Sequence, residues 1–587
     1  MSSNQQSDKE SLAQLRHSAA HLLAAAVMEF WPNTKRTIGP STDEGFYYDF
    51  EFEQPISDKD LSKIEEKMRQ IAKSWKGFEK RELSVSEAAT EVKGNQYKEE
   101  LIAEIAKKGE AITFYRSGEF EDLCRGGHVE NPSVDLKHFK LLSLAGAYWR
   151  GDEKNTMLTR IYGTAFFSEA DLSEYLEQQE QAKLRDHRKL GRELELYFID
   201  EMVGKGLVMW LPKGTIIRDE IEKLVCEKEA DAGYQRVVTP HIAKEELYLT
   251  SGHLPYYKDS MYPPMVMDDG TYYMKAMNCP HHHRIFQHKS RSYRELPLRL
   301  AEYGTCYRNE LSGTLAGLLR VRALAMNDAH MYVRKEQIKT EFANVIRLTQ
   351  EYFDIFGLEN YWFRLSKWDA NNTEKYINQP ENWEYCQQVL REVLQEMKVE
   401  FVEVDDEAAF YGPKVDVQFK SVIGREETMS TIQLDFLAKE RFGLSYVDEN
   451  GGNNNEVFVI HRAPLSVHER FLAFLIEHYA GAFPVWLSPV QVKVLPIADR
   501  HQEYAEKVAA ALKAAGARVE VDDRSERLQA KIRDAQMMKI PYMLVVGDKE
   551  EEQETVAVRK RDGGEQEVVS LADFVIELSE KIKKRVS

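Results

Sequence analysis

Short aromatic strands dominate residues 197–485, and this feature constrains the fold of the chain more than any other. The helical segment TIIRDEIEKLVCEKEADAG precedes the strand YQRVVTP, and segments such as PLRLAEYGTCYRNE and RVRALAMNDAHMYV follow. Because hairpins and loops join these strands, the pattern predicts an antiparallel sheet with helices packed on it. The chain contains no GxxxxGK[ST] loop and no GxGxxG opening a strand–helix–strand unit, so neither a P-loop nor a dinucleotide fold is expected.

The pattern changes at about residue 487, where strands and helices begin to alternate. The strands QVKVLPI, ARVEVDD and YMLVVG are separated by the helical segments RHQEYAEKVAAALKAAG and RLQAKIRDAQMMK, and the hairpin TVAVRKRDGGEQEVV and a final helix follow. Such alternation predicts a separate α/β domain with a mostly parallel sheet.

The N-terminal third combines helices and strands. SLAQLRHSAAHLLAAAVMEFW indicates a helix that Pro32 ends, FYYDFEF alternates like a strand, and ISDKDLSKIEEKMRQIAKSW indicates a second helix capped by Ser57 or Asp58. The polar segment 171–196 is predicted to be a connecting helix. We therefore expect an α+β multidomain protein with an N-terminal domain over 1–166, a linker helix within 167–196, a core over 197–486 and a C-terminal domain over 487–587.

Charge and cysteine usage narrow the class of protein. Seventy-nine basic against 97 acidic residues leave a formal charge of −18, so no overall basic field indicates a nucleic-acid partner. Five cysteines with no CxxC pair favour a reducing compartment. The polar start MSSNQQSDKE has no apolar signal region, and no run approaches 18 apolar residues. These features predict a cytoplasmic protein without a membrane partner.

Two histidines four residues apart, His17 and His21, occupy the helical segment HSAAH. On a helix this spacing stacks both rings on one face, as in the first half of many zinc sites, but the glutamate of an HExxH motif is missing. Cys124 and His128 in CRGGH would complete a set of zinc ligand types. The residues alone leave a metal site and ordinary core or solvated histidines equally open.

A second set of metal-ligand types is scattered over the core. Cys279, His330 and His461 supply one thiol and two imidazoles from distant segments. Three protein ligands with a fourth position open are typical of a functional zinc site. The alternative is that these histidines are buried and only satisfy hydrogen bonds.

Three arginines are candidates for binding a polyphosphate. Arg308 ends one strand segment, Arg320 is expected on the next after the loop LSGTLAGLL, and Arg470 is expected at the start of an amphipathic helix. Guanidinium groups suit bidentate contacts to phosphate oxygens. Each arginine taken singly is equally compatible with a surface salt bridge.

The order of these features resembles class II aminoacyl-tRNA synthetases. A helix and strand that end at Pro240, the segment YRNE (307–310), and an arginine at a late helix start follow the order of motifs 1, 2 and 3 of that class. Within it, the chain resembles the threonyl-tRNA synthetase family over nearly its whole length. The segments that carry this resemblance are YWRGDEKNTMLTRIYGTAF (148–166), MNCPHHHRIF (277–286), LPLRLAEYGTCYRNELSGTL (296–315), NDAHMYV (327–333), AAFYGPKVDV (408–417), STIQLDF (430–436), IHRAP (460–464) and PYMLVVGDKE with VAVR (541–559).

The resemblance implies a fold and an activity. It implies a class II antiparallel catalytic core, an α+β editing domain of the threonyl/alanyl second additional domain type, and a C-terminal α/β anticodon-binding domain. The implied reaction is ATP-dependent attachment of L-threonine to tRNA(Thr) through threonyl-adenylate, with hydrolysis of misacylated seryl-tRNA(Thr). The family further implies Mg²⁺ with ATP, one Zn²⁺ per subunit, and a homodimer formed through the motif 1 region. Many members have a β-grasp domain before the editing domain, and this sequence is expected to lack it.

Residue roles follow from the same resemblance. Cys279, His330 and His461 are implied to hold a zinc ion that binds the amine and hydroxyl of threonine, which excludes the isosteric valine. In the first domain the histidines are implied to position a water against the misacylated ester without a metal. Positions matching substrate, ATP or transfer residues are Arg308, Glu310, Arg320, Asp328, Tyr411, Lys414, Gln433, Arg470 and His253. Positions matching editing residues are His17, His21, Lys98, Asp122, Cys124 and His128, and those matching anticodon contacts are Glu550 and Arg559.

Several positions depart from the family pattern. Ser466 and Val467 stand where Gly-Ser is usual, Met326 replaces a glutamine, and Gly127 replaces a proline. Glu427 and Thr428 stand where Trp-Gln is frequent. We expect these changes to reshape the ATP and threonine subsites and to loosen the CRGGH turn. They also leave open a synthetase-like paralogue acting in RNA binding, regulation or inhibitor resistance, and a stand-alone deacylase.

Overall fold

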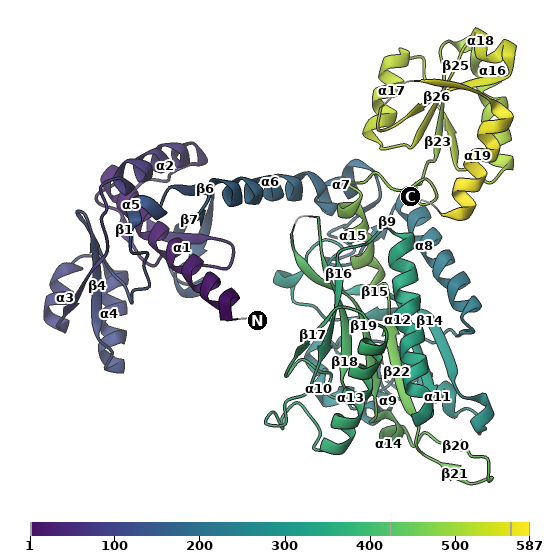
Figure 1. The fold of residues 1–587 in the computed structure, drawn as a ribbon, viewed down its shortest axis with the longest axis horizontal. Helices are drawn as coiled ribbons and strands as arrows, with labels where there is room; N and C mark the ends of the chain where they lie inside the picture. Colours follow the sequence, from purple (N-terminus) through teal and green to yellow (C-terminus); the bar gives the residue numbers. More distant parts are fainter. Residues whose placement is uncertain (1–2, 423, 564–565, 586–587) are drawn as a thin grey trace. The chain divides into compact units, whose positions relative to one another are not determined.

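The computed structural model describes residues 3–422, 424–563 and 566–585, so the outermost residues of the two predicted terminal domains lie outside the described residues. The chain divides into two compact units, residues 1–180 and 181–587, which are described separately (Figure 1). In the described part of the chain, no helix has both the length and the apolar character needed to cross a bilayer.

The first unit is built on helix α1 (Ser3–Phe30), which ends two residues before Pro32 as predicted. Leu22, Leu23 and Val27 of α1 are fully buried against the aromatic side chains of β2 (Phe46–Glu51). The surrounding sheet has the order β1-β2-β7-β6, and a second sheet has the order β3-β4-β5. The remaining bounds are β1 Lys35–Arg36, β3 Glu79–Leu83, β4 Ile112–Ser117, β5 Phe120–Leu123, β6 His138–Tyr148, β7 Met157–Phe166, α2 Asp58–Ala72, α3 Val85–Glu91, α4 Gln96–Lys108 and α5 Pro132–Asp135.

The predicted cap of α2 is confirmed, whereas the predicted connecting helix is not continuous. Ser57 is the N-cap residue of α2, as expected. The segment expected as one helix over 171–196 instead forms α6 (Glu169–Arg185) and α7 (His187–Glu193). Asp186 separates them because its carboxylate accepts a hydrogen bond of 2.7 Å from the backbone N–H of Arg188, which caps a new helix.

An eight-stranded sheet forms the centre of the second unit, in the order β10-β14-β15-β22-β19-β18-β16-β17. Its strands are antiparallel except for the edge pairs β10–β14 and β16–β17, which confirms the predicted antiparallel core. The strand bounds are β10 Gln235–Arg236, β14 Leu298–Tyr307, β15 Ala323–Val333, β16 Tyr361–Ser366, β17 Phe401–Val404, β18 Lys414–Lys420, β19 Glu426–Asp435 and β22 Phe458–Ala463.

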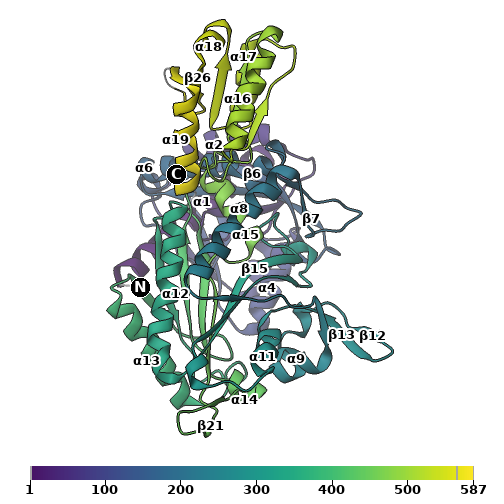
Figure 2. The same cartoon turned by 90° about the vertical axis from the view of Figure 1, so that its right-hand side faces the viewer.

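Helices cover this sheet and bury its apolar side chains. Ile338 and Phe342 of α12 are completely buried in one cluster with Val415 and Ile432 of the sheet. Figure 2 shows α9 and α11 beside one another near the hairpin β12–β13. The bounds are α8 Pro212–Asp231, α9 Glu245–Ser251, α10 His253–Tyr256, α11 Cys279–Gln287, α12 Ile338–Ile355, α13 Pro380–Glu396, α14 Ala438–Phe442, α15 His468–His478, β8 Tyr197–Phe198, β9 Met209–Trp210, β11 Ile242–Lys244, β12 Met265–Met267, β13 Gly270–Met274, β20 Tyr446–Val447 and β21 Asn453–Asn454.

The C-terminal part has its own five-stranded sheet in the order β24-β23-β25-β26-β27. Strands β24, β23 and β25 are parallel to one another, whereas β26 pairs antiparallel with both β25 and β27. The predicted parallel arrangement is therefore found in only one half of the sheet. The short helix α18 was not expected from the sequence. The bounds are β23 Val492–Pro496, α16 Gln502–Ala514, β24 Val519–Val521, α17 Leu528–Met537, β25 Tyr542–Val546, α18 Asp548–Gln553, β26 Thr555–Lys560, β27 Glu567–Ser570 and α19 Leu571–Lys584.

Candidate functional site

A cavity of about 400 Å³ lies on the central sheet of the second unit and brings together most of the predicted core site residues. This volume is within the range of small-molecule sites, about 300–1,000 Å³. The predicted residues that line it are Cys279, Arg308, Glu310, Asp328, His330, Tyr411, Lys414, Gln433, His461 and Arg470. Arg320 and His253 are the two predicted core residues that do not line it.

The sheet register places the two core histidines side by side. His330 on β15 is directly opposite His461 on β22, and their ring centroids are 4.5 Å apart. Cys279 is the first residue of α11, and its thiol completes a set of donor atoms that all lie within 4.8 Å of one another. One thiol and two imidazoles at this separation fit a zinc ion with an open position.

Polar side chains surround this trio. The Tyr411 ring stacks on His461 with centroids 5.3 Å apart, and the Tyr411 hydroxyl donates a hydrogen bond to Gln433. Asp328 is buried beside the trio, and burial raises the pKa of its carboxyl. Its Oδ2 accepts a hydrogen bond of 3.1 Å from the Asn278 amide. The cavity therefore offers acceptors for an amine next to the metal-ligand set.

Only two of the three arginines predicted to bind a polyphosphate line the cavity. Arg470 is the third residue of α15 and donates from Nε to the Leu319 carbonyl at 3.1 Å. Arg320 is not on a strand, since β15 begins only at residue 323, and it donates to Glu310 at 2.8 Å. The strand prediction for Arg320 is wrong because the loop after Glu310 extends past it. Arg308 and Arg470, which were both predicted to bind ATP, do line the cavity.

His253 lies in a separate buried position. Its side chain lines a small cavity of about 20 Å³ together with Cys279 and His461. The Nδ1 atom is 2.7 Å from the Ser251 hydroxyl, whereas the buried Nε2 atom has no hydrogen-bond partner in the described part of the chain. The predicted role of His253 in transfer to tRNA stays a prediction.

Four of the departures from the family pattern contribute to the wall of the core cavity. Met326 and Val467 form a β-bridge and both line the cavity, as do Thr428 and Ser466. Ser466 keeps a left-handed backbone with φ of 55°, the conformation that favours the glycine usual at this position. This wall therefore has more apolar side-chain surface than a glutamine and a serine would provide.

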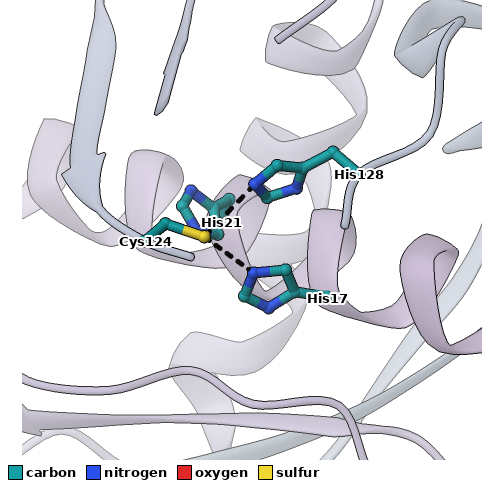
Figure 3. Close-up of side chains that lie close together, drawn as sticks. All are labelled: His17, His21, Cys124 and His128. Carbon is teal, nitrogen blue, oxygen red and sulfur yellow. Dashed lines mark hydrogen bonds between the residues drawn. The ribbon is translucent and has the colours of Figure 1, made fainter. Parts of the chain in front are cut away.

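A larger cavity, of about 920 Å³, lies in the first unit and is lined by five of the six predicted editing residues, His17, His21, Lys98, Asp122 and Cys124, but not by His128. Figure 3 shows His17 and His21 projecting from α1 toward Cys124 and His128 on the facing segment. The donor atoms of these four side chains also lie within 4.8 Å of one another. The geometry alone therefore fits either a metal or a bound water.

Hydrogen bonds assign the protons in this cluster. His17 Nδ1 donates to the Gly39 carbonyl at 3.1 Å, so its Nε2 atom accepts from the Cys124 thiol at 2.9 Å. Ser18 donates to the Gln14 carbonyl, so it accepts from His128 Nδ1 at 3.2 Å. The His128 Nε2 lone pair is thereby directed at the shared space, 3.4 Å from the Cys124 sulfur.

Burial keeps this cluster uncharged. It lowers the pKa of His128 to about 3 and that of His21 well below the usual range, and the neighbouring histidines add to both shifts. Burial also raises the pKa of Cys124 to about 11. Neutral imidazoles beside a protonated thiol present lone pairs that can hold and orient a water through hydrogen bonds.

Asp122 anchors a charged network next to the cluster. Its carboxylate contacts Lys98 at 2.9 Å and Arg36 at 3.2 Å and accepts a hydrogen bond from the Tyr48 hydroxyl. Burial opposes ionisation of Asp122, but the two cations lower its pKa overall. Lys98 and Asp122 were predicted for this site, whereas Arg36 and Tyr48 were not, because no local motif includes them.

Gly127 occupies a turn whose backbone conformation favours glycine, although the space around it would accommodate a Cβ atom. Its φ is +82° and that of Gly126 is +99°. A proline, whose φ is fixed near −65°, cannot adopt this conformation, so this chain forms the turn by a different backbone path.

The two predicted anticodon residues lie on neighbouring elements of the C-terminal sheet domain. Glu550 is in α18 and accepts a hydrogen bond of 3.0 Å from the Gly547 N–H. Arg559 is half-buried on β26, and its Nε atom has no partner among the described residues. Their role in reading bases stays a prediction.

Three family models match the chain. Residues 112–162 match the threonyl and alanyl tRNA synthetase second additional domain, residues 265–479 match the tRNA synthetase class II core domain (G, H, P, S and T), and residues 491–581 match the anticodon binding domain. These matches confirm the predicted fold class of each part.

Relatives match over nearly the whole chain. The threonine–tRNA ligase of Geobacillus sp. (strain WCH70) is 51% identical over 578 residues, covering 98% of this chain and 89% of that protein. Threonine–tRNA ligase 1 of Bacillus subtilis (strain 168) is 50% identical, covering 98% and 90%. A crystal structure described as the RNA binding domain of threonyl-tRNA synthetase from Cryptosporidium parvum Iowa II superposes with a TM-score of 0.64 at 34% identity, covering 67% of this chain and 98% of that one. Because these relatives are about 50% identical over 98% of the chain and the family models match, the chain belongs to the threonyl-tRNA synthetase (threonine–tRNA ligase) family.

Proposed function

We propose that this chain attaches L-threonine to tRNA(Thr) at the expense of ATP, and that it hydrolyses seryl-tRNA(Thr) formed in error. The observation that carries this proposal is the core cavity, where a thiol and two imidazoles meet on one side and two arginines on the other. The near full-length relatives, all threonine–tRNA ligases by name, support it. No comparison favours the alternative of a non-catalytic paralogue.

Cys279, His330 and His461 are proposed to hold one zinc ion per subunit. When bound there, zinc supplies a positive charge and an open coordination position for the amine and hydroxyl of threonine. Asp328 and Tyr411 lie beside the trio and are proposed to orient the same two groups. A site built around a hydroxyl rejects valine strongly because the analogue leaves buried polar groups unpaired.

Arg308 and Arg470 are proposed to bind the ATP phosphates with Mg²⁺, and Glu310, Lys414 and Gln433 to complete the subsite. Both arginines line the cavity from different elements, the end of β14 and the first turn of α15. Arg320 is proposed to act through Glu310, to which it donates at 2.8 Å. Forked guanidinium groups suit the bidentate contacts that phosphate oxygens require.

The first unit is proposed to correct serine, which differs from threonine by one methyl group. Such a difference is worth only about 1–3 kcal/mol in a binding pocket, so a second site is needed. His128 Nε2 and His21 are proposed to position a water for attack on the ester, while Cys124 is held by His17. Lys98 and Asp122 are proposed to bind the substrate next to them.

Further proposals concern partners and location. Glu550 and Arg559 are proposed to contact anticodon bases, which are splayed out in a loop and accessible at their edges. A homodimer through the motif 1 region is supported by Val238, an apolar side chain 85% exposed in the segment that ends at Pro240. A cytoplasmic location is supported by five free cysteines.

Threonine-dependent exchange of pyrophosphate into ATP, measured on the zinc-loaded full-length chain, tests the activation half of this proposal. We expect exchange with threonine, weak exchange with serine and none with valine. Absence of threonine-dependent exchange in zinc-loaded protein would overturn the ligase activity. Hydrolysis of seryl-tRNA(Thr), measured separately, should continue when a chelator has stopped exchange, and a parallel loss of hydrolysis would overturn the metal-free editing site.

A further inference from the structure

We propose that Glu302 and His282 position the metal ligand His330 by determining which of its ring nitrogens carries the proton. The inference rests on the metal centre proposed above and concerns the residues behind it. Neither of the two metal-ligand sets predicted from the sequence includes Glu302 or His282. The structure connects them to the centre by an unbroken line of hydrogen bonds.

Glu302 begins this line from the neighbouring strand β14, where it is 4% exposed. Its Oε1 atom accepts from the backbone N–H of Thr239 at 2.8 Å and lies 3.4 Å from the Lys275 ammonium group. Its Oε2 atom accepts from the Thr239 hydroxyl at 2.9 Å and from His282 Nε2 at 3.1 Å. Every acceptor position of the carboxylate therefore faces a donor.

These partners keep Glu302 ionised despite its burial. Burial alone would raise its pKa, but the hydrogen bonds from His282 and Thr239 and the charge of Lys275 lower the pKa to about 2. A carboxylate only accepts hydrogen bonds. The proton between Glu302 and His282 consequently resides on His282 Nε2.

The proton on Nε2 leaves the other nitrogen of a neutral His282 ring as an acceptor. His282 Nδ1 lies 2.8 Å from His330 Nδ1, and the two rings are nearly perpendicular at 84°. Two ring nitrogens at this distance share one proton, and only His330 can provide it. His330 is therefore protonated at Nδ1, and the lone pair of its Nε2 atom is free to bind a metal.

The second histidine ligand, His461, also has one protonated and one free ring nitrogen, because it donates directly to a carboxylate. Asp435 Oδ2 accepts from His461 Nε2 at 3.1 Å, which leaves His461 Nδ1 with the free lone pair. Asp435 is held in turn by the backbone N–H groups of Leu437 and Ala438 at 2.7 and 2.9 Å. Each imidazole is thus hydrogen-bonded to a carboxylate, His461 directly to Asp435 and His330 to Glu302 through His282. Loss of such an outer partner typically weakens metal binding by about 10–100-fold.

The substitution Glu302→Gln tests the relay because it reverses the direction of the hydrogen bonds. The donors at Oε1 hold the amide oxygen there, so the amide NH₂ faces His282. His282 then accepts at Nε2 and donates from Nδ1, and the His330 proton moves to Nε2, where it blocks the metal. We expect zinc affinity, measured on the full-length chain by competition with a chromophoric chelator, to fall by about 10–100-fold.

Glu341→Gln is the matched control. Glu341 is also 4% exposed and in the second unit, and it receives two hydrogen bonds of 2.7 Å from Arg299, but it has no contact with the metal-ligand trio in the described structure. Its zinc affinity should stay within twofold of the unsubstituted chain. The same affinity in Glu302→Gln would overturn the relay. If the unsubstituted chain bound neither Zn²⁺ nor Co²⁺, the metal centre itself would be overturned and the inference with it.

A second measurement does not depend on the folding of any variant. Nitrogen-15 NMR of the metal-free, unsubstituted chain distinguishes protonated from unprotonated ring nitrogens. We expect His282 to be protonated at Nε2 and His330 at Nδ1. A His330 ring protonated at Nε2 would contradict the relay even if zinc still bound.

Discussion

Two clusters of one cysteine with histidines lie in the described part of the chain, and they differ more in the hydrogen-bond partners of their rings than in their ligand types. His17, His21, Cys124 and His128 in the first unit, and Cys279, His330 and His461 in the second, each have donor atoms within 4.8 Å of one another. Both sets contain the ligand types that zinc binds. The first cluster even offers one donor more than the second.

The surroundings separate the two clusters. In the first, His17 donates to a backbone carbonyl and His128 to a hydroxyl, and the nearby Asp122 is occupied by Lys98 and other donors. In the second, Asp435 Oδ2 accepts a hydrogen bond directly from His461 Nε2. Carboxylate partners increase the basicity of imidazole ligands and orient them for a metal. The outer contacts, more than the ligand sets, therefore favour a metal at the second cluster over the first.

Alanine substitutions of one histidine in each cluster are expected to have the largest effects on the two activities. We expect His461→Ala to abolish zinc binding and threonine-dependent exchange while leaving seryl-tRNA(Thr) hydrolysis unchanged. We expect His21→Ala to slow hydrolysis by about 10²–10⁴-fold, the usual contribution of a general base, while exchange continues. His138→Ala, a histidine of the first unit that pairs with Glu169 on the surface, is the control that should affect neither. Loss of both activities in either site variant would erase the distinction between the clusters.

The sequence predicted the architecture well because each domain has its own periodic pattern. Alternating strands and helices after residue 487 predicted the separate α/β domain, in which β24, β23 and β25 are parallel, and the aromatic strands before it predicted the antiparallel sheet. The continuous linker helix was predicted wrongly, since one side-chain cap at Asp186 outweighs the helical propensity on both sides.

The sites were predictable only in part. The family motifs include the metal-ligand trio and the editing histidines, because those residues lie within recognisable local segments. Glu302 and Asp435 also lie in such segments, LPLRLAEYGTCYRNELSGTL and STIQLDF, but neither segment indicates which side chain they contact. They approach the histidines only when strand register and helix placement bring distant segments together. Side-chain direction in a packed sheet depends on that register, which periodicity alone does not determine.

The pH dependence of the two activities sharpens the comparison. Burial lowers the pKa of His128 to about 3 and that of His21 still more clearly below the usual range, so these bases stay neutral through mildly acidic solution. We expect the rate constant of seryl-tRNA(Thr) hydrolysis to stay within about threefold between pH 5 and pH 8, where an ordinary histidine with pKa about 6.5 would lose most of its basic form. A fall to half the rate near pH 6.5 would show exposed histidines instead.

The lowered pKa values of these histidines also make the stability of the first unit depend on pH. The unfolded chain binds a proton at each histidine near pH 6.5, whereas the folded cluster does not, so the unfolded state binds more protons below that pH. The first unit should therefore lose stability as the pH falls from about 6.5 toward 3. Thermal unfolding at several pH values measures this loss, and the variant His128→Gln, which cannot titrate, should show less of it.

The smallest expected effect concerns the wall of the core cavity, at Ser466. Its φ of 55° is costly for a residue with a Cβ atom, by about 1–2 kcal/mol, but a glycine also gains about 0.4–1 kcal/mol of entropy in the unfolded chain. Ser466→Gly should therefore raise the free energy of unfolding by about 1 kcal/mol or less, whereas Ser466→Ala keeps the backbone strain and should not stabilise. Denaturant unfolding compares the two variants. Equal stability of both would mean that the strain released by glycine is no larger than the entropy that glycine gains in the unfolded chain, and a less stable Ser466→Gly would mean that the left-handed turn imposes little strain on Ser466.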